Sequence, residues 1–421
     1  MIDTREELIH ALYEAAEIEH GLMIQYLFAA LMMKKRLDET ITGTQQELIR
    51  KWEGQILTVA REEMAHLGTV CNLLSAIGGS PHFERPNFPQ KATKYYPFSF
   101  ILARFSDEAL YSFIRFELPK DEIPPSPPII RDPLIRKLDK QALSRLFNFS
   151  PDPLEYDYVG ELYRKIREGF NTIPEQNLFI GPRSGQDYEY WSQRVSILRV
   201  IDRKTANIAV DSIIDNGEGS PGKRQGSHYD TFLKMRMELN TQIQAQADFE
   251  PSRFVVLNPR TRKYHRDTPD TQETTLIENT DAKRVAELFN ACYEVVLLML
   301  SQLYSFGGES LQERDALRQA SRQLMSSALR PIAEILTEMP ATTPTNDPNQ
   351  GNAGPTFELY GNLQLSTQQS NRWLILNERL DAVINEGAKL SSVNQRLKFI
   401  SENISLIKHN IEQTLMSEEK L

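Results

Sequence analysis

Hydrophobic residues recur every three or four positions along most of the chain, which is the spacing of one face of an α-helix. In the first helix that this spacing predicts, the hydrophobic face runs from Leu8 to Met33. A second long helix is predicted over 45–77, where two glycines, a serine and a proline end it. Because only a short link separates them, we expect these two helices to pack as an antiparallel hairpin.

The same spacing predicts further helices along the rest of the chain. They are expected over 107–117, 156–170, 188–216, 227–247, 281–306, 310–339 and 371–416. Six prolines from Pro119 to Pro133 exclude regular structure from one long loop, and only 254–257 has the composition of a short strand. The predicted fold class is therefore all-α and bundle-like. We expect a bundle over 1–250 and a helical extension packed on it over 251–421.

The composition of the 421 residues is that of a globular protein, with 40% hydrophobic and 25% charged residues. The net charge of −9 argues against nucleic acid as a partner. The longest apolar run, 295–300, is far shorter than the roughly 20 residues that cross a bilayer, so no membrane association is expected. Two cysteines, Cys71 and Cys292, are too few for a disulfide framework, and the N-terminus lacks a secretory signal, which together favour a cytoplasmic location.

Charged side chains interrupt the hydrophobic faces of the first two helices. Glu19 lies on the first face, and Glu63 and His66 lie on the second. A carboxylate in a core must be paired, protonated or bound to a metal, and the Glu-x-x-His spacing puts a carboxylate and an imidazole one turn apart. One glutamate from one helix and Glu-x-x-His from the next are ligands of a dinuclear centre, and this donor set suits iron or manganese. Tyr26, two turns after Glu19, is placed to hydrogen-bond a ligand or to take part in catalysis as a redox side chain.

Two alternatives remain open from these residues alone. Glu62 competes with Glu63, although the separation of three residues from His66 favours Glu63. Glu62 is equally well placed to be a solvated partner of Arg61. A metal-free core, in which Glu19, Glu63 and His66 pair with cationic side chains, is the other interpretation.

The residues that could form the second half of the site are less evident from the sequence. Glu161 is a candidate ligand near the start of a predicted helix, where it lies beside the hydrophobic face. The alternative is that it is a solvated glutamate of the first turn. Glu168, two turns later on the same side, is a competing candidate ligand. The end of the following predicted helix carries Asp211, Asp215 and Glu218. Acids at a helix C-terminus are unfavourable for its dipole and suggest a bound cation. His228 follows after a glycine-rich break and opens the next predicted helix.

Six pieces of the sequence resemble the ferritin-like family that includes the iminophenyl-pyruvate dimer synthase domains of violacein- and rebeccamycin-type pathways. The pieces are 16–27, 63–67, 72–79, 160–163, 217–219 together with 227–229, and 354–358. Because these pieces are distributed from residue 16 to residue 358, the resemblance covers most of the chain and implies a ferritin-like four-helix bundle with additional C-terminal helices and long proline-rich loops. The metal ligands that it implies are Glu19, Glu63, His66, Glu161, Glu218 and His228.

The resemblance implies a non-haem oxidoreductase of secondary metabolism with two metal ions, iron or alternatively manganese. The best-studied relatives couple two amino-acid-derived imines oxidatively, so the implied partner is a small molecule such as an aromatic amino-acid-derived imine. Two other functions fit the same residues: peroxide disproportionation by a dimanganese centre, and a metal-binding structural bundle without turnover. A homo-oligomer is compatible with the sequence, with 350–415 as a candidate interface.

Overall fold

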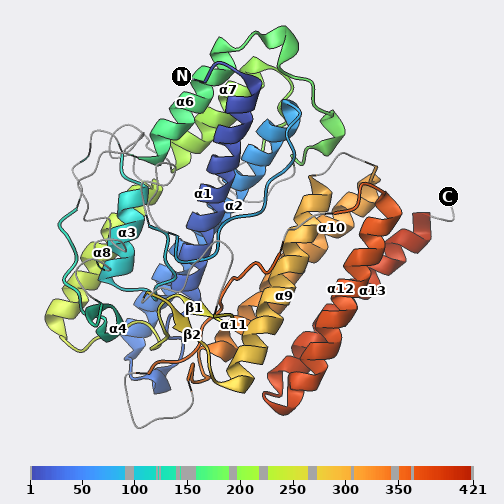
Figure 1. Ribbon diagram of the computed structural model, residues 1–421. Helices are drawn as coiled ribbons and strands as arrows, with labels where there is room; N and C mark the ends of the chain where they lie inside the picture. The colour runs from blue at the N-terminus through green and yellow to red at the C-terminus, as the bar shows by residue number, and fades with distance from the viewer. Residues whose placement is uncertain are drawn as a thin grey trace.

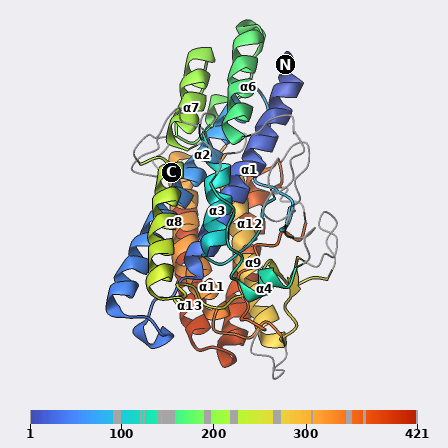
Figure 2. The same ribbon diagram turned by 90° about the vertical axis from the view of Figure 1, so that its left-hand side faces the viewer.

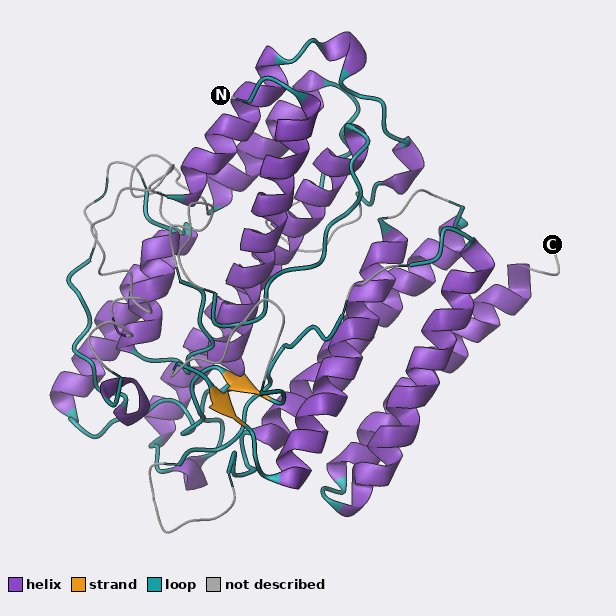
Figure 3. Ribbon diagram, viewed as in Figure 1, coloured by secondary structure: helices purple, strands orange, loops and turns teal. Residues whose placement is uncertain are grey.

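The computed structural model describes residues 2–90, 99–119, 122, 125–138, 143, 158–188, 197–217, 226–263, 273–304, 308–342, 350–361 and 365–418. Nearly all regular structure in these ranges is helical, which confirms the all-α prediction (Figures 1 and 3). The strands described are two short ones, β1 (Pro259–Arg260) and β2 (Thr275–Leu276), which pair in parallel.

Two long helices form the predicted hairpin at the centre of the first half of the chain. They are α1 (Arg5–Leu31) and α2 (Gly43–Ala76), and they pack along each other. Each begins at a threonine N-cap, Thr4 or Thr42, within a capping box. From Ile18 onward nearly every residue of α1 is buried, so neighbouring elements surround this part of the helix on all sides.

Four shorter helices complete a four-column bundle around the hairpin. They are α3 (Asp107–Phe116), α6 (Val159–Thr172), α7 (Arg203–Asn216) and α8 (His228–Ala245). Helix α3 packs on α8, and α6 packs on α7. Figures 1 and 2 show α6 and α7 beside one end of the hairpin and α3 and α8 beside the rest of it. Two of the columns are therefore made of two helices each.

The C-terminal half adds a second layer of helices. These are α9 (Thr280–Leu303), α10 (Leu311–Leu324), α11 (Arg330–Leu336), α12 (Gln369–Lys389) and α13 (Arg396–Glu418). The other short elements in the described residues are α4 (Pro133–Arg136), a π-helix at Met325–Leu329, and 3₁₀ helices at Leu37–Glu39, Glu175–Asn177, Arg183–Gly185 and Leu390–Ser392. Among the described residues, α9 alone is long and apolar enough to span a membrane, yet 83% of its apolar window is buried. Packing of α10, α11 and α12 on α9 accounts for that composition.

Three predicted elements differ from the observed ones. The helix predicted over 188–216 begins only at α7, because Asp202 caps it there, and 197–201 is not helical. The helix predicted over 371–416 is two helices, α12 and α13, which pack against each other. The predicted strand at 254–257 forms only an isolated bridge, in which Val255 pairs with residue Asn352.

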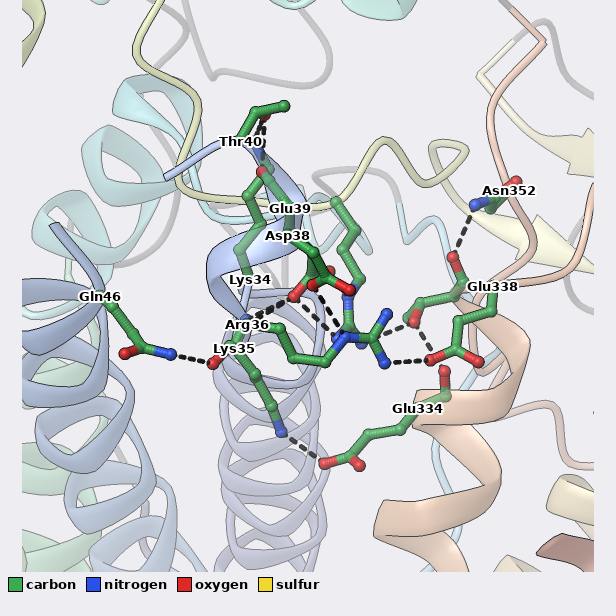
Figure 4. A network of polar contacts seen from close by, with 12 residues as sticks. Lys34, Lys35, Arg36, Asp38, Glu39, Thr40, Gln46, Glu334, Glu338 and Asn352 are labelled. Atoms are coloured by element: carbon green, nitrogen blue, oxygen red, sulfur yellow. Dashed lines mark hydrogen bonds and ion pairs between the residues drawn. The ribbon is translucent and has the colours of Figure 1, made fainter. Parts of the chain in front are cut away.

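Ion pairs connect the link after α1 to the end of α11 (Figure 4). Lys35 pairs with Glu334, and its Nζ also lies 3.2 Å from Glu53 Oε1 on α2. The next residue, Arg36, places Nη1 3.3 Å from Glu338 Oε1. The second layer is thereby joined to the hairpin at one end of the bundle.

Candidate metal centre

Five buried acidic and imidazole side chains meet inside the four-column bundle. Glu19, Glu63 and His66 form one group whose ligand atoms lie within 4.8 Å of one another, and Glu63, Glu117 and His228 form another. All five residues are at most 1% exposed. Because Glu63 belongs to both groups, it lies between two candidate ion positions.

The helices position these side chains in two different ways. Glu19 projects from α1, and Glu63 and His66 project one turn apart from the same face of α2. Glu117 instead is the C-cap residue directly after α3, and His228 is the first residue of α8. One group is therefore built on continuous helices and the other uses two helix ends.

The two oxygens of Glu63 face two different imidazoles. His66 Nδ1 lies 2.8 Å from Glu63 Oε2 in a hydrogen bond, and His228 Nδ1 lies 2.9 Å from Oε1. The second contact lacks hydrogen-bond geometry, so Oε1 and His228 Nδ1 have no hydrogen-bond partner. Oε2 of Glu19 lies 3.5 Å from His66 Nδ1, and Oε2 of Glu117 lies 3.5 Å from His228 Nδ1, also without hydrogen-bond partners. Carboxylate and imidazole atoms thus converge on two positions without satisfying one another.

Burial and neighbouring charges shift the pKa values of these groups. Burial raises the pKa of Glu19 to about 7, despite the opposing effect of His66. Burial also raises the pKa of Glu63, but His228 and His66 outweigh it and hold this pKa well below its usual range. Burial lowers the pKa of His66, but Glu63 and Glu19 outweigh it and raise the value to about 10. The carboxylates therefore draw positive charge into the core, which protons or metal ions can supply.

Two buried tyrosines hold the outer carboxylates. Tyr26 Oη donates a hydrogen bond to Glu117 Oε1 at 2.6 Å, and Tyr163 Oη donates to Glu19 Oε1. Each tyrosine contacts one oxygen and leaves the other oxygen directed at an imidazole. Such hydrogen bonds fix the orientation of ligating carboxylates.

A third contact orients the imidazole of His228. Its Nε2 lies 2.8 Å from Glu62 Oε2, so the ring donates outward to Glu62 and presents Nδ1 to Glu63 and Glu117. A metal-bound histidine commonly donates its other N–H to a carboxylate in this way, which fixes the tautomer. Glu62 is 3% exposed, so it is not the solvated residue that the sequence offered as one interpretation.

The structure brings together four of the six ligands that the resemblance implied: Glu19, Glu63, His66 and His228. Glu161 lies outside both groups, with 33% of its side chain exposed and Oε1 3.7 Å from Lys165 Nζ. Glu218 lies outside the described residues. Of the other acids considered, Glu168 is exposed and Asp211 pairs with Arg167 at 2.8 Å.

Glu117 was missed by the reasoning from sequence. Its signal was an acid at the C-terminal end of a predicted helix, between Phe116 and Leu118. An acid is unfavourable at that end of the helix dipole, and the apolar neighbours predict burial. Asp211 and Asp215, toward the end of α7, are acids in a similar position.

A cavity of about 500 Å³ lies between α2 and α8. Glu62 and His228, which are both buried, line its inner part, whereas Arg50 and Lys51 line its outer part. The half of the centre that contains His228 therefore adjoins a space large enough for a small organic molecule.

Comparisons with known proteins match the bundle and much of the second layer. A family model described as ferritin-like matches residues 12–237, more than half of the chain and all five clustered side chains. Dichlorochromopyrrolate synthase of Lentzea aerocolonigenes is 27% identical over 399 residues, which cover 85% of this chain and 36% of that protein. The 2-imino-3-(indol-3-yl)propanoate dimerase of Chromobacterium violaceum is 26% identical over 370 residues, 81% of this chain and 33% of that protein. The chain thus spans about a third of the length of these relatives.

Among solved structures, a ferritin-like protein from Caulobacter vibrioides is similar, with a TM-score of 0.44 and 17% identity. The similarity covers 78% of this chain and 93% of that one.

Proposed function

This chain belongs to the ferritin-like family, and we propose that it is a non-haem dinuclear metal oxidoreductase of secondary metabolism. The observation that carries the proposal is the position of Glu63, whose two oxygens face His66 Nδ1 and His228 Nδ1. A second carboxylate faces each imidazole: Glu19 faces His66, and Glu117 faces His228. Three carboxylates and two imidazoles suit two iron ions, with manganese as the alternative.

The chemistry of the donor atoms fits such a pair of ions. Four buried atoms near the two positions have no hydrogen-bond partner: Glu19 Oε2, Glu63 Oε1, Glu117 Oε2 and His228 Nδ1. Buried polar atoms in proteins are normally paired, because desolvation without a partner is costly. Cations at the two positions would satisfy all four atoms and would replace the protons that the imidazoles otherwise bind.

The residues have distinct roles in this proposal. Glu63 would contribute to both positions, Glu19 and His66 would complete one, and Glu117 and His228 would complete the other. Two such ions, when bound, supply Lewis acidity and exchange electrons with an oxidant. The protein holds the donors in its core, where each is at most 1% exposed, and Tyr26 and Tyr163 keep the outer carboxylates in place.

For the substrate we propose an aromatic amino-acid-derived imine, two molecules of which are coupled. The names of the two relatives, a chromopyrrolate synthase and an iminoindolylpropanoate dimerase, support this class. Joining two such molecules through one C–C bond releases two protons and two electrons. Hydrogen peroxide can accept the two protons and the two electrons, which gives two molecules of water. The cavity beside His228 supports an organic substrate.

A structural metal site without turnover is the second candidate. The observation that favours it is the complete burial of Glu19, Glu63, His66 and Glu117. A metal that only stabilises the fold needs no access, whereas an enzyme needs a route to at least one ion.

Metal analysis tests the centre itself. We expect about two iron or manganese ions per chain by plasma mass spectrometry, and loss of both in a folded Glu63→Ala/His66→Ala double variant. The matched pair is Glu117→Gln and Glu161→Gln: the first should lower the content to about one ion, and the second should leave it unchanged. Loss of metal only in Glu161→Gln would restore the ligand implied by the resemblance. Wild-type protein that takes up no metal after anaerobic reconstitution would contradict the proposal.

Turnover is tested on the metal-loaded protein. The imine formed from tryptophan by an amino-acid oxidase is supplied with hydrogen peroxide, and products are measured by mass spectrometry. We expect a product with twice the mass of the imine less two hydrogen atoms. Peroxide consumption without that product would favour disproportionation, and neither reaction would favour the structural site.

A further inference from the structure

The two candidate ion positions are alike in their inner contacts. Both adjoin an oxygen of Glu63, one further carboxylate and the Nδ1 atom of one imidazole. At each position a buried tyrosine donates a hydrogen bond to the further carboxylate. Because these inner contacts match, they give neither position the more negative surroundings.

The outer nitrogens of the two histidines differ. His228 Nε2 lies 2.8 Å from Oε2 of Glu62, a residue that is 3% exposed. His66 Nε2 is also buried, but it has no hydrogen-bond partner in the part of the chain that the structure describes. One imidazole is therefore backed by a buried carboxylate, and the other is not.

A carboxylate behind an imidazole changes what the imidazole offers to a metal ion. By accepting the outer N–H, Glu62 makes Nδ1 of His228 the more basic donor. A buried negative charge also favours the more positive oxidation state of a nearby ion, because buried charges are screened less than exposed ones. The cavity between α2 and α8 acts in the same direction. It reaches Glu62 and His228 but not Glu19 or His66, and a polar space lowers the cost of additional positive charge beside it.

We propose that Glu62 makes the two positions unequal in redox potential, so that iron held by Glu117 and His228 is oxidised before iron held by Glu19 and His66. The inference rests on the proposed function, because it assigns an order of oxidation to that same centre. Two ferrous ions give up one electron each, and hydrogen peroxide accepts both electrons with two protons to give two molecules of water. The Nε2 proton of His228 stays in its hydrogen bond to Glu62.

Two variants that each retain one position compare the positions directly. Glu19→Gln removes a donor from one position and Glu117→Gln removes a donor from the other, so each variant should hold about one iron ion. The potential of that ion is measured by anaerobic potentiometric titration followed by electron paramagnetic resonance. At the same solution potential, we expect the ratio of ferric to ferrous iron to be about tenfold higher in Glu19→Gln. A tenfold ratio corresponds to 59 mV for one electron.

Glu62→Gln, added to each of these variants, tests the cause of the difference. It keeps an acceptor for His228 Nε2 but removes the charge. We expect it to lower the ratio of ferric to ferrous iron about tenfold in Glu19→Gln and to leave the ratio unchanged in Glu117→Gln. Glu47→Gln, at an exposed acid of the same helix, is the matched control and should change neither ratio.

Equal potentials in the two single-ion variants, the reverse order, or an equal effect of Glu62→Gln in both would overturn the inference. If a single-ion variant holds no iron, the protein with two iron ions decides. It should be oxidised in two separate one-electron steps, and Glu62→Gln should raise the potential of the first step by about 59 mV and change the second less. Unchanged steps would overturn the inference and leave the metal centre in place. Wild-type protein that takes up no iron would overturn the proposed function as well.

Discussion

Replacing Glu62 by alanine should weaken metal binding at one of the two proposed positions and spare the other. Glu62 Oε2 lies 2.8 Å from His228 Nε2, and both side chains are at most 4% exposed. A buried hydrogen bond to a charged group contributes roughly 1.5–3 kcal/mol. That range corresponds to about 10–100-fold in metal affinity, as is typical of residues that orient a ligating histidine. Glu62→Gln keeps an acceptor but loses the charge, so its effect should be smaller.

Calorimetric titration of the metal-free protein with Mn²⁺ under anaerobic conditions measures this effect. Wild type should bind about two ions, and Glu62→Ala should still bind two, with only one affinity reduced about 10–100-fold. Glu47→Ala, an exposed acid on the same helix, is the control and should bind as wild type does. Equal weakening of both positions would refute the reasoning that Glu62 acts through His228, and so would an unchanged titration.

Three further predictions follow from the same contacts. Tyr163→Phe removes the hydrogen bond to Glu19. It should lower the metal affinity about tenfold only at the proposed position with Glu19 and His66, as measured by the same titration. His66 has its pKa raised to about 10, so it stabilises the metal-free fold fully below about pH 6.5 and loses this contribution as the pH rises through 10. Urea unfolding at pH 7 and pH 10 should show this loss, and saturating metal should reduce it. Gly54→Ala should raise the unfolding free energy by about 0.5–1 kcal/mol, whereas Gly68→Ala should lower it, because its Cβ would lie 2.5 Å from the Tyr304 hydroxyl.

The hairpin was predictable because its determinants are local. The hydrophobic faces of α1 and α2, and the glycines after Ile77, are visible in the sequence within a few residues of the observed ends. The break between α12 and α13 was not, because 390–395 contains neither glycine nor proline. The local signal there is weaker: Asn394 Oδ1 accepts a hydrogen bond from Arg396 N at 3.0 Å at the start of α13, and α13 then packs back on α12.

The candidate site divides in the same way. Glu19, Glu63 and His66 were found because helical periodicity places them on buried faces. Whether Glu117 or Glu161 can reach the site depends on the level along α1 and α2 at which each glutamate lies. Periodicity reports which face of a helix is buried but not how far along its neighbours it lies. Helices α3 and α6 pack on different partners, α8 and α7, and only the three-dimensional structure shows that the end of α3 reaches Glu63.

The use of helix ends makes the two halves of the centre unequal. Glu19, Glu63 and His66 project from continuous helices, so displacing them requires distortion of α1 or α2. Glu117 and His228 lie where α3 ends and α8 begins, and terminal positions of helices absorb changes in backbone angles more readily. The cavity adjoins this second half. We therefore expect an organic ligand in this cavity to perturb a metal ion held by Glu117 and His228 more than one held by Glu19 and His66.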